Sequence, residues 1–332
     1  MVIHPWAWGI LALVAIGLVV IDFLGHARNP HPPTAAEAGR WTLFYVGLAV
    51  LFGVGIWLTN GWLYAQEFYA GWAMEWSLSV DNLFVFILIL KAFRVPRENQ
   101  QKALLLGIVI ALLLRLAFIL LGAALVSRFS WVFFIFGAWL LWTAVSQVRE
   151  TARGEEEDEE YHENGFIRLV RHVLPITDGF VGNRLLYRHG GHTYLTPLAV
   201  VVLALGSADL MFAFDSIPAI FGITQQAFLV FACNVFALMG LRQLFFLVDA
   251  LLSKLVYLGY GLGVILSFIG VKLILEALHA NTLPFINSGR GVEWAPNISV
   301  SVSLGVIVVT LAVTVVASLI RTAMDEGDAR ER

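Results

Sequence analysis

The stretch that decides the fold reads Glu75-Trp-Ser-Leu-Ser-Val-Asp81-Asn-Leu-Phe-Val-Phe86. It places two carboxylates inside a segment that is otherwise apolar enough to cross a bilayer. A second stretch, Asp209-Leu-Met-Phe-Ala-Phe-Asp215-Ser-Ile-Pro218, repeats the spacing of the two acids and again follows the second acid with a small polar residue. The fold and the function both have to explain these two acid pairs.

The composition is typical of a membrane protein. The chain has 332 residues, of which 59% are hydrophobic and 14% are charged, and its mean hydropathy is +0.80. A soluble domain has about 45–50% apolar and about 25% charged residues. The single cysteine, Cys233, excludes an internal disulfide framework and a cysteine-based metal cluster.

Apolar runs of about 20 residues match a helix that crosses a hydrocarbon core of about 30 Å. They predict an all-α, polytopic membrane helix bundle of about nine spans. The predicted spans are residues 5–24, 41–60, 68–90, 103–126, 131–148, 197–217, 227–252, 255–278 and 298–320. The first run has no preceding Lys or Arg and no clear cleavage site, so we expect it to remain in the protein as a span.

The basic residues predict the orientation, because Lys and Arg beside spans stay in the cytoplasm. With the N-terminus outside and the C-terminus inside, sixteen basic residues fall on the cytoplasmic side. Only Arg128 and Arg290 fall on the outer side, and Arg115, Arg242 and Lys272 lie within spans. The sequence therefore predicts a multi-pass membrane protein with an outside N-terminus and a cytoplasmic C-terminus.

The longest connection, residues 149–196, is then cytoplasmic and contains six consecutive acidic residues at 155–160. Blocks of like charge repel, so we expect a solvated, largely disordered loop. The loop also holds His162, His172, His189 and His192. A weaker alternative is a cation-collecting or sensing loop, although these histidines lack a recognisable ligand spacing.

Residues 68–148 and 197–278 are predicted to be two copies of one three-span unit. Each copy begins with an acid pair and has an arginine in its second span, Arg115 in one and Arg242 in the other. Three spans per copy, joined by one cytoplasmic loop, give the copies opposite topology. The sequence therefore predicts an inverted three-plus-three repeat with a transport site at its interface.

Helix geometry separates the two acids of each pair. Six residues are about 9 Å of rise and about 120° of net rotation, so Glu75 and Asp81 cannot easily hold one ion together. Span three runs inward and span six runs outward. Antiparallel packing is therefore expected to bring Glu75 level with Asp215 and Asp81 level with Asp209, as two stacked carboxylate pairs along one path.

Neutral oxygens occur at comparable depth. Pro218 cannot donate to the carbonyl of Phe214, so it is expected to bend or break the helix beside Asp215 and to free that carbonyl as a ligand. Further neutral polar groups are Ser79, Asn82, Ser207, Ser216 and Asn234. An oxygen-rich site without imidazole or thiolate favours a hard divalent cation such as Mn²⁺, Ca²⁺ or Mg²⁺.

The buried bases allow a different interpretation, in which Arg115, Arg242 or Lys272 pairs with the acids and only holds helices together. Each central charge costs about 2.5–3.5 kcal/mol on insertion scales, a large penalty for packing that small residues provide. We therefore assign the acids to a site and the arginines to counter-charges. Asp22 is a supporting candidate, because an acid followed by Gly and His at an inner span end could line an exit.

Four segments resemble the signatures of the TerC family of bacterial integral membrane proteins. They are residues 75–86, residues 209–221, Asn234-Val-Phe-Ala-Leu-Met-Gly-Leu-Arg242 and Tyr260-Gly-Leu-Gly-Val-Ile-Leu-Ser-Phe-Ile-Gly-Val-Lys272. The resemblance covers about residues 22–320. It implies an inner-membrane protein of a family named for tellurium resistance, whose better-understood members export Mn²⁺ and supply it to secreted proteins.

The resemblance assigns the family's functional acids to Glu75, Asp81, Asp209 and Asp215. The chain departs from the usual pattern at Gly206, where many relatives have Glu three residues before the position of Asp209. This difference removes one inner ligand and leaves the two acid pairs intact.

Two functions remain open from the sequence. The first is a secondary transporter of Mn²⁺ or a similar divalent cation, driven by protons or the membrane potential, since no nucleotide-binding motif is present. Export as its direction is what the resemblance to TerC proteins implies. The second is a non-transporting membrane scaffold or insertion factor that acts in tellurite or metal stress through residues 149–196. An anion or amino-acid exporter is disfavoured by the excess of acids over bases in the spans. We expect no enzymatic activity, no cofactor and no nucleic-acid partner.

Overall fold

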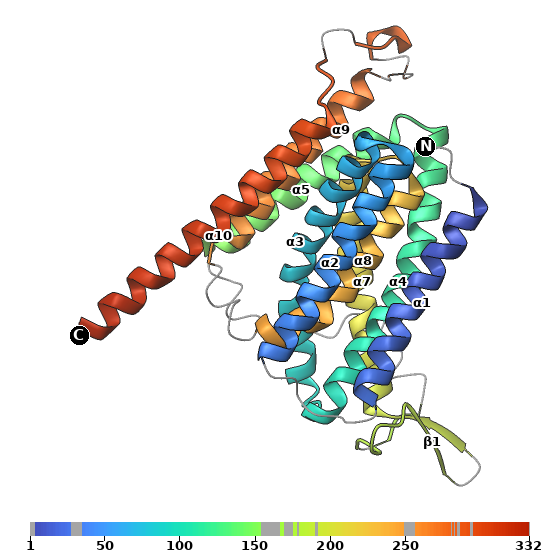
Figure 1. The fold of residues 1–332 in the computed structure, drawn as a ribbon, viewed down its shortest axis with the longest axis vertical. Helices are drawn as coiled ribbons and strands as arrows, with labels where there is room; N and C mark the ends of the chain where they lie inside the picture. The colour runs from blue at the N-terminus through green and yellow to red at the C-terminus, as the bar shows by residue number, and fades with distance from the viewer. Residues whose placement is uncertain are drawn as a thin grey trace.

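In the computed structural model, long helices make up most of the described chain (Figure 1). The structure describes residues 4–27, 35–153, 167–168, 175–177, 179–189, 192–248, 256–279, 281, 283, 286–292 and 295–331. The helices are α1 (Pro5–Ala27), α2 (Ala35–Asn60), α3 (Trp62–Ala92), α4 (Arg97–Arg128), α5 (Val132–Arg153), α7 (Pro197–Phe221), α8 (Ala227–Val248), α9 (Leu258–His279), the short η3 (Asn287–Gly289) and α10 (Val300–Glu331). Apolar runs form helices because a backbone within a bilayer must satisfy its own hydrogen bonds.

A helix covers most of each predicted span. Six helical stretches of the described residues are long and apolar enough to cross a membrane: Ala36–Asn60, Arg97–Arg128, Val132–Arg153, Pro197–Phe221, Leu258–His279 and Val300–Met324. Large apolar side chains also cover outward faces, with Leu58 77% exposed and Val313 62% exposed. The all-α polytopic architecture is confirmed, and the number of nine spans stays a prediction.

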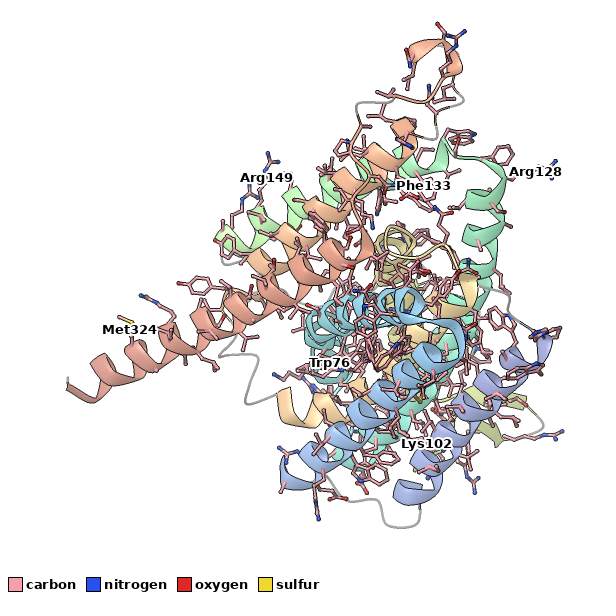
Figure 2. All side chains as sticks on the ribbon, turned by 45° about the horizontal axis from the view of Figure 1, so that its top comes forward. Trp76, Lys102, Arg128, Phe133, Arg149 and Met324 are labelled. Atoms are coloured by element: carbon pink, nitrogen blue, oxygen red, sulfur yellow. The ribbon has the colours of Figure 1, made fainter. Side chains whose placement is uncertain are left out.

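The helices form two groups. In the main bundle of α1, α2, α3, α4, α7 and α8, α3 packs on α8 and α4 packs on α7. α5 packs closely along α9, α10 lies against α9 and α3, and these three helices cross the bundle as a tilted layer (Figure 1). Lys102 and Arg128 mark opposite ends of α4 (Figure 2). The seam between the groups brings α3 and α7 against α5 and α9.

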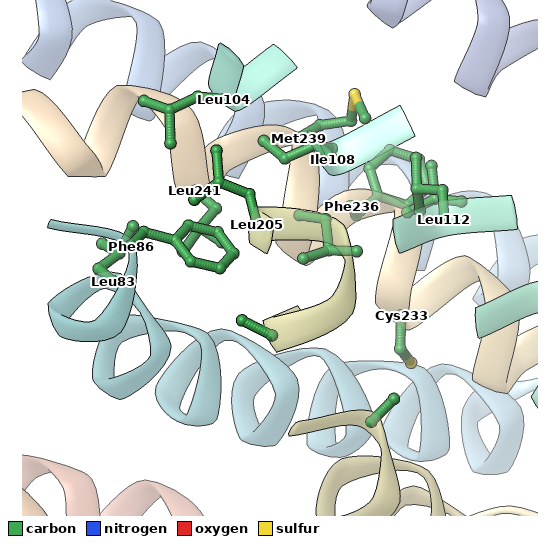
Figure 3. Close-up of a cluster of buried hydrophobic side chains, with 14 of the residues drawn as sticks. Leu83, Phe86, Leu104, Ile108, Leu112, Leu205, Cys233, Phe236, Met239 and Leu241 are labelled. Carbon is green, nitrogen blue, oxygen red and sulfur yellow. The ribbon is translucent and has the colours of Figure 1, made fainter. Parts of the chain in front are cut away.

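The buried apolar side chains form two clusters. The larger one fills the main bundle, where Leu205 and Phe236 lie among other apolar side chains (Figure 3). The smaller one includes Leu140 of α5 and Ile269 of α9 and extends to α3 and α10. The smaller cluster therefore lies at the seam itself, where α5 and α9 meet α3 and α7.

Two glycines set the contact between α5 and α9. A Cβ atom at Gly137 would lie 2.8 Å from the carbonyl oxygen of Gly270, and a Cβ atom at Gly270 would lie 3.0 Å from the carbonyl oxygen of Gly137. Small residues allow helix backbones in membranes to approach this closely. The crossing holds α5 and α9 together.

Part of the long connection forms a β-hairpin. Strand β1 (Leu186–His189) pairs antiparallel with β2 (His192–Leu195), with His189 opposite His192. The prediction of a largely disordered loop is wrong for these residues. The acidic run 155–160, His162 and His172 lie outside the described residues.

The hairpin leads directly into α7 through Thr196. Its hydroxyl donates to the carbonyl of Arg184 at 2.7 Å, and its oxygen accepts the N–H of Ala199 as the N-cap of α7. A threonine in this position satisfies one of the free N–H groups at a helix start. The hairpin is thereby attached to the membrane bundle.

Pro218 does not interrupt α7. The helix continues to Phe221, and the N–H of Gly222 donates to the carbonyls of Pro218 and Ala219. The predicted break beside Asp215 is therefore wrong. Because Pro218 lies in the last turn, little helix has to continue beyond it, although its ring nitrogen still cannot donate to the carbonyl four residues back.

Candidate cation site

Acids from two helices meet on one buried arginine, Arg115 of α4. Its Nε–H donates to Oδ2 of Asp209 on α7 at 2.7 Å and its Nη2–H donates to Oδ1 at 3.1 Å. Its Nη1–H donates to Oε1 of Glu75 on α3. All three side chains are buried, with at most 1% exposed. One guanidinium therefore links the three helices, each near its middle.

Two neutral side chains complete this arginine cluster, which comprises Glu75, Arg115, Asp209, Ser216 and Asn234. Nη1 of Arg115 also donates to Oδ1 of Asn234 on α8 at 2.6 Å and to Oγ of Ser216 at 3.3 Å. Ser216 lies seven residues after Asp209, close to two full turns, so both face the same side of α7. The cluster joins α3, α4, α7 and α8.

The arginine cluster retains negative charge. Two carboxylates and one guanidinium sum to a formal charge of −1, as −2 and +1. Oε2 of Glu75 and Oγ of Ser79 are buried and have no hydrogen-bond partner among the described residues. A buried, unsatisfied carboxylate oxygen is unfavourable, so this cluster has capacity for a further cation or proton.

Asp215 lies apart from the arginine cluster, on another face of α7. Its Oδ1 accepts hydrogen bonds from Nε1 of Trp139 at 2.7 Å and from Oγ1 of Thr143 at 3.1 Å, both on α5. The residue is half-buried, and within the described ranges no basic side chain forms an ion pair with it. Its charge, when ionised, is therefore compensated only by neutral donors.

A cavity of about 270 Å³ opens beside Asp215, between α3, α5, α7 and α9. Its polar lining consists of Asn82, Thr143, Ser146, Gln147, Glu150 and Asp215. A single water needs roughly 10–15 Å³ of such space, so the cavity has room for several waters or a hydrated ion. The cavity lies at the seam between the two helix groups.

The predicted pairing of Glu75 with Asp215 is wrong. The structure joins Glu75 to Asp209 through Arg115, as expected by the interpretation in which a buried base pairs with the acids. Asp215 faces α5 instead, because it lies about 120° around α7 from Asp209. Lys272 takes no part, since its Nζ donates to a serine hydroxyl of α10 at 3.0 Å.

Three predicted site residues have side chains outside the described part of the structure. These are Asp22 on α1, Asp81 on α3 and Arg242 on α8. The helices continue through all three positions, and the roles assigned to these side chains stay predictions.

Gly206, where the family resemblance expects Glu, lies at the contact of α7 with α4. A Cβ atom there would lie 2.8 Å from Cγ2 of Ile110. A glutamate at this position would therefore force the side chain of Ile110, or the contact of α4 with α7, to shift. The glycine fits the close packing that brings Arg115 to Asp209.

Sequence reasoning missed the α5 side of the cavity. Thr143, Ser146, Gln147 and Glu150 recur at spacings of three or four residues, which places them on one face of the helix. This spacing within an apolar run was the available signal. It is weak, because Ser, Thr and Gln also serve helix packing in membranes.

A helical bundle with apolar outer faces and an ion cluster buried between its helices is a multi-pass integral membrane protein. The model of the "Integral membrane protein TerC family" matches residues 60–326, and the chain belongs to this family. No solved structure is significantly similar to the chain.

Three membrane proteins illustrate which known proteins the chain is similar to. An uncharacterized membrane protein of Mycobacterium tuberculosis is 45% identical over 311 residues, which are 94% of this chain and 78% of that protein. An uncharacterized membrane protein of Myxococcus xanthus is 35% identical over 318 residues, which are 96% of this chain and 93% of that protein. The thylakoid membrane protein TERC of Arabidopsis thaliana is 38% identical over 280 residues, which are 84% of this chain and 68% of that protein.

Proposed function

We propose that this chain is a secondary transporter that exports a divalent cation, with Mn²⁺ as the first candidate. The environment of Asp215 supports this proposal most directly. A half-buried carboxylate with only neutral donors faces a cavity of about 270 Å³ inside a membrane bundle. Such a carboxylate attracts a cation strongly, because little else in its low-dielectric surrounding compensates its charge.

Asp215 and Asn82 are the first ligands of the cargo in this proposal. Both offer oxygen, which hard divalent cations prefer. Within the described residues no three His, Cys, Asp or Glu side chains come together as a metal cluster. The cargo would therefore keep part of its water shell, and Asp81, one residue before Asn82, is proposed as a further ligand.

The arginine cluster is proposed as a second cation position, deeper in the main bundle. Glu75, Asp209 and Asn234 would supply its oxygens. Arg115 reduces the repulsion between the two carboxylates when no cation is present, which is the counter-charge role. The formal charge of −1 on the cluster supports this role over that of an anion site.

Helix contacts support the proposed inverted repeat. The contact of α3 with α8 is matched by that of α4 with α7, and α5 pairs with its counterpart α9. In the repeat, α3 corresponds to α7, α4 to α8 and α5 to α9. Exchanging the two copies therefore turns the α3–α8 contact into the α7–α4 contact. Gly137 and Gly270 lie at the α5–α9 crossing, each against the other's backbone. Such repeats place transport sites at their interface.

The proposed membrane orientation, transport direction and metal preference rest on the sequence. The basic residues favour an outside N-terminus and a cytoplasmic C-terminus, and the resemblance to TerC proteins favours Mn²⁺, export and a bacterial inner membrane. Transport driven by protons or the membrane potential is proposed because no nucleotide-binding motif occurs in the sequence.

Ion flux into proteoliposomes tests the proposal, with Mn²⁺, Ca²⁺ and Mg²⁺ in competition. We expect the parent to move Mn²⁺ and Asp215→Asn to lose about tenfold or more of the rate, which corresponds to about 1.4 kcal/mol or more of lost stabilisation by the charged ligand. Glu276→Gln is the matched control, because Glu276 accepts from Gln225 at 2.7 Å and does not line the cavity. Equal rates for Asp215→Asn and the parent would refute the proposal.

A membrane scaffold or insertion factor is the second candidate. The pairing of Glu75 and Asp209 with Arg115 favours it, because buried acids with a counter-charge can serve packing alone. Deletion of residues 155–160 discriminates the two candidates. A scaffold that binds through the cytoplasmic loop should lose function in cells, whereas a transporter should keep its flux.

A further inference from the structure

One face of α5 extends the cavity away from Asp215. Thr143, Ser146, Gln147 and Glu150 line it in succession. The first three are half-buried and Glu150 is exposed, and Oγ of Ser146 donates to Oε1 of Glu150 at 2.7 Å. These four residues, the α5 polar face, therefore connect the carboxylate of Asp215 to the exposed end of the helix.

The α5 polar face is long compared with one ion. Thr143, which donates to Asp215, is seven residues from Glu150, which is about 10 Å along the helix. Metal–oxygen bonds of divalent cations are only about 2.0–2.6 Å long. The ligand set of one bare ion is therefore more compact than this face, whose length suits successive positions of a hydrated ion.

The polar side chains of this face need contact with water. A hydroxyl or carboxylate turned to lipid would lose its hydration without replacement. Val145, which does not line the cavity, is 47% exposed and apolar, as a lipid-facing position should be. α5 thus presents one apolar outer side and one polar side toward the seam.

We infer that the α5 polar face is the wall of a water-filled vestibule that admits a hydrated divalent cation to Asp215. Glu150 is the first carboxylate at its mouth. The mouth lies at the end of α5 that carries Arg149, whose side chain points away from the bundle (Figure 2). The divalent cation as occupant rests on the proposed function, whereas the vestibule itself rests on the cavity and its lining.

Cysteine accessibility in membrane vesicles tests the vestibule. The buried Cys233 is first replaced by serine, whose hydroxyl can still donate to the carbonyl of Phe68 as the thiol does. Single cysteines are then placed at Thr143, Ser146 and Val145. A charged, membrane-impermeant thiol reagent is added to right-side-out and inverted vesicles in parallel, with and without Mn²⁺.

We expect Thr143→Cys and Ser146→Cys to react from one side about tenfold or more faster than Val145→Cys, since thiols in lipid are not reached by a charged reagent. Mn²⁺ should slow the reaction at Ser146→Cys. Equal labelling rates at Ser146→Cys and Val145→Cys would overturn the vestibule, because they would mean that lipid or another protein covers this face. Rapid labelling that Mn²⁺ does not slow overturns the cation as occupant.

A flux measurement separates this inference from the proposed function. Glu150→Gln is expected to raise KM for Mn²⁺ about fivefold at low salt and to keep the maximal rate, because a charge at the mouth concentrates cations without ligating them deep inside. Glu150→Asp should restore the parental KM. An unchanged KM in Glu150→Gln overturns its role at the mouth, whereas absence of Mn²⁺ flux in the parent refutes the proposed function.

Discussion

Replacement of Arg115 by methionine is expected to destabilise the folded protein strongly. Arg115 is fully buried and compensates two buried carboxylates, those of Glu75 and Asp209. Removal of one partner from a buried ion pair costs about 3–5 kcal/mol. We expect this cost for only one of the two ion pairs. After the substitution one of the two acids can bind a proton, which removes the repulsion between the carboxylates.

The free energy of unfolding can be measured by titrating the purified protein in detergent with a denaturant while following the fluorescence of its 11 tryptophans. The triple variant Arg115→Met, Glu75→Gln, Asp209→Asn removes the charge from the cluster and leaves groups of similar size. It should recover at least about half of the lost free energy, since the uncompensated charge causes most of the loss. Lys272→Met, a buried base bonded to a serine, should cost only about 1 kcal/mol.

Two results are expected in this titration. Arg115→Met must unfold at a lower denaturant concentration than the parent, and the triple variant must lie between them. An unchanged midpoint for Arg115→Met would mean that the cluster contributes no stability. A triple variant as unstable as the single one would mean that the loss comes from packing rather than from charge.

Three further substitutions follow from local contacts. Gly270→Leu would force its side chain against the backbone of Gly137, so overpacking should lower the free energy of unfolding by about 1–3 kcal/mol in the same titration. Thr196→Val removes the cap of α7 and its hydroxyl, and should cost about 1 kcal/mol by that measurement. Trp139→Phe removes an indole donor from Asp215 while keeping an aromatic ring; in the flux assay it should lower KM for Mn²⁺ by about tenfold, because the carboxylate loses a hydrogen bond of about 1.5 kcal/mol or more that compensates its charge when no cation is bound.

Hydropathy was sufficient to place the helices, because a run of about 20 apolar residues has few alternatives to a buried helix. The predicted span 131–148 differs from α5 mainly by the added turn that contains Glu150. The hairpin of residues 186–195 was missed, because it follows a strongly charged stretch whose composition indicates an open loop. Apolar periodicity thus predicts spans well and their polar connections poorly.

The candidate site could be predicted only in part. Spacing correctly indicated that Asp209 and Asp215 face different sides of α7, since this depends on helix geometry alone. It could not indicate that Arg115 would bond both Glu75 and Asp209, because the facing of α4 toward α7 depends on contacts such as that of Gly206 with Ile110. Helix rotation relative to neighbours is a property of the packed bundle and not of one span.

The two acids of α7 now differ in what they can do. Asp209 is held by two hydrogen bonds from one guanidinium, so a cation can displace that contact only if α4 and α7 separate or the arginine withdraws. Asp215 has neutral donors on a single oxygen and a cavity beside it, so a cation can reach it without breaking an ion pair. If the chain transports a cation by alternating access, as proposed, occupation of Asp215 is therefore expected to come first. In the proposed cycle, opening of the arginine cluster is then the step that needs movement of α4 relative to α7, within the main bundle.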